Sequence, residues 1–187
     1  MTMKRWHLPA FVIAALVTLL LLNGIVWQHE QTLKHGRAVL LQLRPVDPRS
    51  LMQGDYMALD YQLTQQVGQL LSTTDATAGE GQALAVMLNA DADGVAQLLR
   101  IAKAGEQAQN DEIRLRLKWE NGGARLPSQS YFFAEGEGAR FAKARYAIFR
   151  VANDGTALLA GLADEQRQPI ADRVDKPSSS PAGVGGS

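Results

Sequence analysis

Cysteine is absent from this chain of 187 residues. Without a thiol, the chain can form no disulfide, thiolate zinc site or iron–sulfur cluster, and it has no cysteine nucleophile. Histidine is scarce as well, because His7, His29 and His35 all lie at or before the start of the globular part. A histidine-based metal site or catalytic triad in the folded core is therefore not expected, and no cofactor is predicted.

An excess of one charge is also missing. Lysine plus arginine total 19, aspartate plus glutamate total 19, and the formal net charge is zero. Nucleic-acid-binding proteins normally carry a basic excess or a basic face, and acidic disordered chains carry many carboxylates. Hydrophobic residues make up 46% of the chain. Its length and composition therefore predict one folded domain of ordinary size and no nucleic-acid partner.

The longest uncharged run is Leu8–Trp27, which directly follows a short basic N-terminus. As a helix the run would extend roughly 30 Å, the thickness of the hydrocarbon core of a bilayer. A cleavable signal peptide has a shorter apolar segment of about 7–15 residues and a small-residue cleavage site, which is not found here. A buried core helix would not require the basic end. Residues 8–27 are therefore predicted to be an uncleaved transmembrane anchor.

The charges that flank this anchor predict its orientation. Lys4 and Arg5 lie within a few residues of its start, whereas the cations beyond its end are further away and are offset by a carboxylate. Those far-side charges are Glu30, Lys34 and Arg37. The positive-inside rule then places residues 1–7 in the cytoplasm and the main domain outside. In a bacterium with an outer membrane, this is an inner-membrane protein with a periplasmic domain.

The rest of the chain is predicted to be mainly β. Side chains alternate most regularly where apolar residues at 113, 115, 117 and 119 interleave with Arg114, Arg116 and Lys118. Alternation at 57–63 predicts another strand, and residues 64–82 are interpreted as a surface loop. About eight strands with short turns predict an antiparallel sandwich or small barrel over residues 37–162. Proline, serine and glycine then predict a disordered tail over 163–187.

Residues 54–61 carry a recognisable octet, Gly54-Asp55-Tyr56-Met57-Ala58-Leu59-Asp60-Tyr61. It resembles the octet that names the bacterial GDYXXLXY family, with Gly54, Asp55, Tyr56, Leu59 and Tyr61 at the named positions. The segments 45–49 and 131–138 are similar to the family's other landmarks. The resemblance implies a membrane-anchored protein with no established activity. Family members are often encoded beside multi-spanning membrane proteins, which implies such a partner.

The octet has a structural and a functional interpretation. Gly54 and Asp55 suit a tight turn, while Leu59 and Tyr61 would lie on a buried face and Tyr56 on the exposed face. Every named position is then explained by folding. In the functional interpretation, the octet and the turn before it form a recognition edge. Its residues are Pro45, Asp47, Pro48, Tyr56 and Asp60.

Other candidate sites are less specific. Asp91-Ala92-Asp93-Gly94 resembles the start of a calcium loop but lacks its later ligands, so a hairpin turn is predicted and no metal site. The basic residues of the strand at 113–119 are typical of a solvated face. The alternative interpretation is that they bind an anionic lipid or the acidic surface of a partner. Ser50 with Lys103 or Lys143 as base would resemble a membrane-anchored signal peptidase. The Ser-Met-x-Pro motif expected around the serine of such a peptidase is absent.

These observations predict a non-catalytic accessory or interaction module for a membrane partner. A membrane-anchored serine–lysine hydrolase is the alternative, and it requires Ser50 beside a desolvated lysine amine. No small-molecule ligand is identifiable from the sequence.

Overall fold

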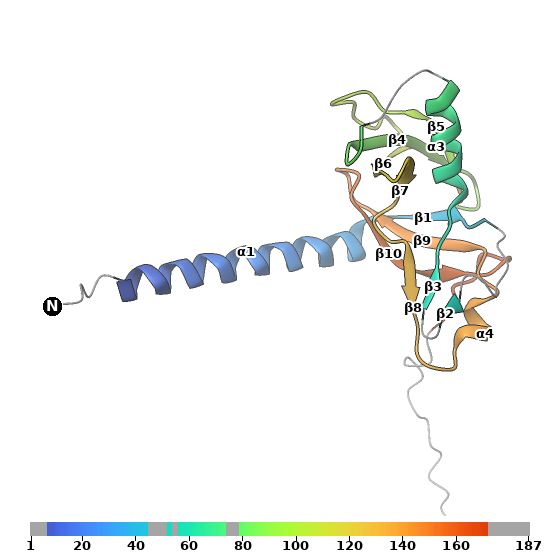
Figure 1. Cartoon of the computed structure of the whole chain (residues 1–187). Coiled ribbons are helices and arrows are strands. Elements are labelled where there is room, and N and C mark those ends of the chain that lie inside the picture. The colour runs from blue at the N-terminus through green and yellow to red at the C-terminus, as the bar shows by residue number, and fades with distance from the viewer. Residues whose placement is uncertain (1–6, 45–51, 54–55, 74–78, 172–187) are drawn as a thin grey trace, which may run out of the picture.

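The structure is a computed structural model that describes residues 7–44, 52–53, 56–73 and 79–171 (Figure 1). A long N-terminal helix projects away from a β-rich domain. This arrangement confirms the predicted fold class, an apolar helix followed by mainly antiparallel sheets.

The N-terminal helix α1 spans His7–His35. Among the residues described, it is the one helix long and apolar enough to cross a membrane. Its apolar side chains from residue 11 to residue 27 are exposed, because the β domain covers none of them. An exposed helix that is apolar all round requires an apolar environment, and this helix therefore has the properties of a membrane anchor or a signal sequence.

Gly36 makes the junction between α1 and the first strand. Its amide donates to the carbonyl of Thr32 at 2.8 Å, which closes the last turn of the helix. A Cβ at this position would overlap that carbonyl and lie 3.2 Å from the backbone of Val151. Glycine is therefore the residue that allows the helix end to contact the sheet this closely.

The strands form three sheets, and within each one the paired strands are antiparallel. The first, in the order β1-β9-β10, comprises Arg37–Gln42, Tyr146–Val151 and Ala157–Ala163. The second, β2-β3-β8, comprises Met52–Gln53, Tyr56–Ala58 and Ser130–Phe132. The third, β5-β4-β6-β7, comprises Ala96–Ile101, Ala83–Ala90, Glu112–Glu120 and Gly123–Arg125. An isolated bridge pairs Leu40 of β1 with Val95, which precedes β5. A second bridge pairs Leu43, which follows β1, with Tyr61, which precedes α3.

One hydrophobic core joins the sheets. It is built from the inward-facing side chains that the alternation predicts, such as Ile113, Leu115 and Leu117 of β6. Phe141, from the short helix α4 (Gly138–Phe141), and Phe149 of β9 are its two largest fully buried residues. Burial of such apolar side chains is the main stabilising contribution to a domain of this size.

The strand predicted at 57–63 and the loop predicted at 64–82 were wrong over residues 59–73. Of the other predicted loop residues, 74–78 lie outside the described residues and 79–82 belong to no helix or strand. The strand β3 ends at Ala58, and the chain then enters helix α3, Gln62–Thr73, which contacts β1, β5 and β7. Leu63, Val67 and Leu71 are the buried residues of this helix, and their spacing of four residues matches one helical face. Apart from Leu70, the other positions of this helix are polar or small, so the composition resembled that of a loop.

The predicted start of the tail also requires correction. Ala163 pairs with Pro169, and the amide of Ile170 donates to the carbonyl of Leu162 at 2.8 Å. Arg140 donates to the carbonyl of Ala171 at 2.6 Å. Backbone pairing therefore holds residues 163–171 against β10 although this segment lacks apolar periodicity. The remainder of the predicted tail, residues 172–187, lies outside the described residues.

Candidate functional site

The C-terminal half of the octet lies in the core. Leu59 is buried, and its amide donates to the carbonyl of Gln129 at 2.8 Å. Tyr61 is 2% exposed, and its hydroxyl donates to the carbonyl of Ser128 at 2.6 Å. Its ring makes an edge contact with Phe149 at 5.8 Å between centroids. Burial raises the pKa of Tyr61, so its hydroxyl remains a hydrogen-bond donor. These two octet positions serve the fold.

One named octet position, Tyr56, is less buried than Leu59 and Tyr61. Tyr56 of β3 is half-buried and is the cross-strand partner of Phe132 on β8, with 5.6 Å between the ring centroids. Phe132 is 73% exposed. Phe132 lies outside the octet and was not among the predicted site residues, although the alternation of Tyr131, Phe132 and Phe133 indicates that one aromatic ring must face outward.

The proposed recognition edge is described in part. Its members Pro45, Asp47 and Pro48 lie outside the described residues, as do Gly54 and Asp55 of the octet. Asp60 accepts a hydrogen bond from Arg44 at 2.9 Å, and this ion pair is partly exposed. Tyr56 and Asp60 therefore belong to different local environments, an aromatic pair and an ion pair.

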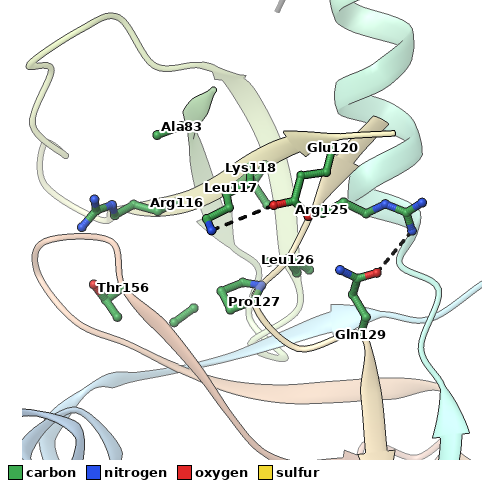
Figure 2. Close-up of a pocket in the computed structure, with 11 residues that line it drawn as sticks. Ala83, Arg116, Leu117, Lys118, Glu120, Arg125, Leu126, Pro127, Gln129 and Thr156 are labelled. Atoms are coloured by element: carbon green, nitrogen blue, oxygen red, sulfur yellow. Dashed lines mark hydrogen bonds and ion pairs between the residues drawn. The ribbon is translucent and has the colours of Figure 1, made fainter. Parts of the chain in front are cut away.

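A cavity of about 400 Å³ opens between β6, β7 and the start of β10 (Figure 2). We name it the basic notch. Apolar groups line its floor, and three cations lie around it: Arg116, Lys118 and Arg125. Among the described residues that line the notch, Glu120 is the sole carboxylate. The cationic groups point in different directions in Figure 2 and do not converge on one point.

The family model described as GDYXXLXY protein matches the chain over residues 18–162. The chain belongs to the GDYXXLXY family. No curated protein and no solved structure matches it. The match includes the octet, Phe132 and all strands except the last residue of β10, so these features lie within the family domain.

The hydrolase alternative requires a lysine amine that is shielded from water. The candidate bases Lys103 and Lys143 of this GDYXXLXY protein are both exposed, and so is every other lysine that the structure describes. None of these lysines has the shielded environment that a serine–lysine pair requires. Ser50 lies outside the described residues.

The predicted hairpin at 91–94 is confirmed. Asp91 Oδ1 accepts the amides of Asp93 and Val95, each at 2.9 Å, and Gly94 adopts a φ of +81°. The carboxylate thus stabilises its own turn. Among the described residues, no three acidic or histidine side chains are grouped where they could hold a metal ion.

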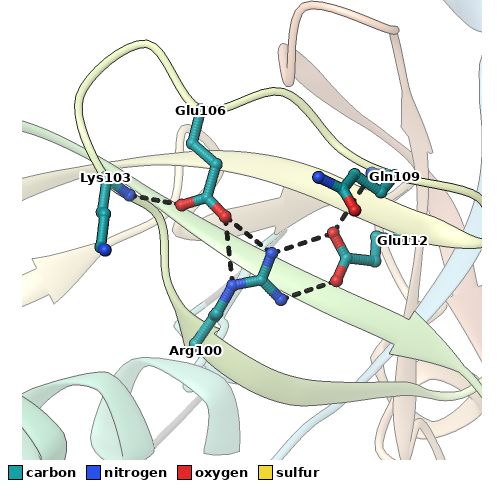
Figure 3. Close-up of polar contacts among 5 residues, drawn as sticks. All are labelled: Arg100, Lys103, Glu106, Gln109 and Glu112. Atoms are coloured by element: carbon teal, nitrogen blue, oxygen red, sulfur yellow. Dashed lines mark hydrogen bonds and ion pairs between the residues drawn. The ribbon is translucent and has the colours of Figure 1, made fainter.

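A charged cluster holds the loop between β5 and β6 (Figure 3). Arg100 donates to Glu112 at 2.6 Å and to Glu106 at 2.7 Å. The second oxygens of these carboxylates accept the backbone amides of Gln109 at 3.2 Å and Lys103 at 2.8 Å. Because every charge in this cluster has a close partner, it is a structural element of the GDYXXLXY domain.

The same contacts shift the ionisation of both carboxylates. The Lys103 amide, followed by the Arg100 guanidinium, lowers the pKa of Glu106. Arg100, followed by the Gln109 amide, lowers the pKa of Glu112. Since both pKa values are lower in the folded state, the cluster stabilises the fold at pH values above the ordinary glutamate pKa of 4.5. This stabilisation is lost as the pH falls through the lower folded-state values.

Replacing Arg100 with glutamine is therefore expected to lower the melting temperature at pH 7, because two carboxylates lose their shared cation. The difference from the parent protein should shrink as the pH falls below 4.5, when both carboxylates become protonated. Thermal unfolding followed by circular dichroism across pH measures this. Arg44→Gln is the matched control, since a single exposed ion pair contributes little. A difference for Arg100→Gln that is independent of pH would contradict the assignment.

Proposed function

We propose that this GDYXXLXY protein is a single-span inner-membrane protein whose β-rich domain acts in the periplasm. The domain serves as a non-catalytic accessory or interaction module for a membrane partner, such as a multi-spanning membrane protein. The N-terminus lies in the cytoplasm, and α1 remains attached as the anchor.

The charges around α1 support this orientation. On the domain side, Lys34 forms an ion pair with Glu30 at 3.1 Å, and Arg37 donates to the carbonyl of Asp111 at 2.9 Å. The charge of Lys34 is therefore offset within the chain, and Arg37 lies ten residues beyond Trp27. Lys4 and Arg5 immediately precede the apolar run. The positive-inside rule therefore favours a cytoplasmic N-terminus.

The interaction role rests on one observation, the exposed ring of Phe132, which contacts the half-buried ring of Tyr56. Phe132 is 73% exposed on β8, the last strand of its sheet in the order β2-β3-β8. An exposed large ring at a sheet edge costs solvation free energy, and aromatic residues are enriched among residues that dominate binding. An edge strand can also pair with an extended segment of another chain. Both properties suit a protein-binding edge.

Site-specific photo-crosslinking in intact cells tests the proposed edge. A photoreactive residue in place of Phe132 is expected to form an adduct with an integral membrane protein. The matched control is Leu99, which is 48% exposed on β5, an edge strand of a different sheet. No adduct from position 132, or equal adducts from both positions, would refute the proposed edge.

Melting curves show whether the probe is placed on a folded domain. Phe132→Ser removes an exposed ring and should leave the melting temperature nearly unchanged. Loss of the fold in that variant would mean that the ring supports the sheet and is not available for binding.

A further inference from the structure

The basic notch contains a charge arrangement that the fold itself does not explain. Lys118 of β6 and Arg125 of β7 are direct cross-strand partners, so two cations oppose each other on the sheet. Like charges in this position destabilise a strand pair. Lys118 lies 3.9 Å from Glu120, and Arg116 lies 3.7 Å from Asp154. Both contacts are long and solvent-exposed, in contrast to the contacts of 2.6 and 2.7 Å made by Arg100.

We propose that the basic notch binds an extended acidic peptide segment of a protein partner. Arg116 and Lys118 are two residues apart on one strand, which places their side chains on the same face about 7 Å apart. Alternate side chains of an extended ligand have the same spacing. A segment with carboxylates at alternate positions would therefore match this row, and Arg125 extends it onto the neighbouring strand.

The shape of the notch supports a peptide rather than a small anion. The three cations are spread around the opening in Figure 2, so one carboxylate or phosphate could not contact all of them. Leu126, Pro127 and Ala157 contribute to the lining, and most of the exposed lining is apolar. Such a floor accommodates the apolar side chains that alternate with acidic ones in an extended segment.

The position of the domain favours a protein ligand over a membrane lipid. Helix α1 continues through the polar residues 28–35 after the apolar run ends at Trp27. At 1.5 Å per residue, these residues hold the sheets about 12 Å beyond the end of the apolar run. The notch is also separate from Tyr56 and Phe132, so this inference goes beyond the proposed function and does not depend on it.

A synthetic peptide that alternates glutamate and valine over about eight residues provides the probe, because this length spans the notch as a strand. The full chain, held in a nonionic detergent, is titrated into the fluorescently labelled peptide at low salt, and binding is followed by anisotropy. The glutamate peptide is expected to bind at least about tenfold more tightly than a peptide with glutamine in place of each glutamate. Its affinity should fall as salt is added.

Charge-reversed variants locate the site. Arg125→Glu is expected to weaken peptide binding at least about tenfold. Lys143→Glu changes the net charge equally at an exposed position outside the notch lining, and should leave the affinity within about twofold. The melting temperature of Arg125→Glu should be equal to or above that of the parent protein, because the substitution removes a like-charge pair.

Three outcomes would overturn the proposal. They are equal affinity for the glutamate and glutamine peptides, equal weakening by the two charge reversals, and displacement of the peptide by vesicles of anionic phospholipid. If Arg125→Glu does not fold, Lys118→Gln tests the same prediction with a smaller change. Phe132→Ser should leave peptide binding intact, so failure of this proposal is distinguishable from failure of the proposed interaction edge.

Discussion

Replacing Tyr61 with alanine is expected to lower the free energy of unfolding by about 3–5 kcal/mol, the range for truncation of a large ring in a core. The residue is 2% exposed and contacts Phe149, so removal of its ring leaves a cavity that the surrounding sheets fill only in part. The carbonyl of Ser128 also loses its hydrogen bond of 2.6 Å. Chemical denaturation at equilibrium measures the change.

Two variants separate the contributions to this loss. Tyr61→Phe keeps the ring and removes the hydroxyl, and should cost about 1 kcal/mol, the usual net value of one hydrogen bond. Tyr56→Ala removes the other ring of the octet, which is half-buried, and should cost about 1 kcal/mol or less, as for a cross-strand pair. Equal and severe destabilisation by Tyr56→Ala and Tyr61→Ala would mean that the whole octet serves folding, and would contradict the proposed edge.

A reporter enzyme that is active only in the periplasm is expected to be active when fused to the C-terminus of the chain. A reporter that is active only in the cytoplasm should be silent at the same position. The expected difference is all-or-none, because a domain behind a single span lies on one side of the membrane. The physical reason is the pair of cations, Lys4 and Arg5, at the start of the apolar run.

Two controls make this experiment decisive. Lys4→Gln combined with Arg5→Gln should reduce periplasmic activity, whereas Lys34→Gln should not, because Lys34 is already paired with Glu30. The fusion should also remain in the membrane fraction with the full mass of the 20.3 kDa chain plus the reporter. A shortened, soluble product would identify residues 8–27 as a cleaved signal sequence. An active cytoplasmic reporter would reverse the proposed orientation.

Among the predictions from sequence, the most reliable rest on patterns that extend over many residues. The apolar run at 8–27 indicates a helix without reference to any other segment, because its length and lack of charge are sufficient. The alternation along β6 indicates which side chains face the core, since a strand reverses side at each residue. The octet also identified the family over most of the chain.

Short or mixed patterns were misinterpreted where the tertiary structure decides. Apolar residues at 57, 59, 61 and 63 predicted a continuous strand, but β3 ends at Ala58. Leu63 is instead the first buried residue of α3. One residue can end an alternating pattern and begin a helical one, and packing selects between them. Similarly, polar residues 163–171 become ordered because they pair with β10, and no local pattern encodes that contact.

The sequence by itself determined the long apolar helix, the mainly β class, the family and the residues of the octet, because each depends on local composition or on a contiguous motif. Only the tertiary structure decided which aromatic ring of 131–133 faces outward and that Lys118 opposes Arg125. Both depend on strand register, which aligns residues that are distant in sequence through hydrogen bonds and core packing. The proposed edge and the basic notch are both consequences of that register.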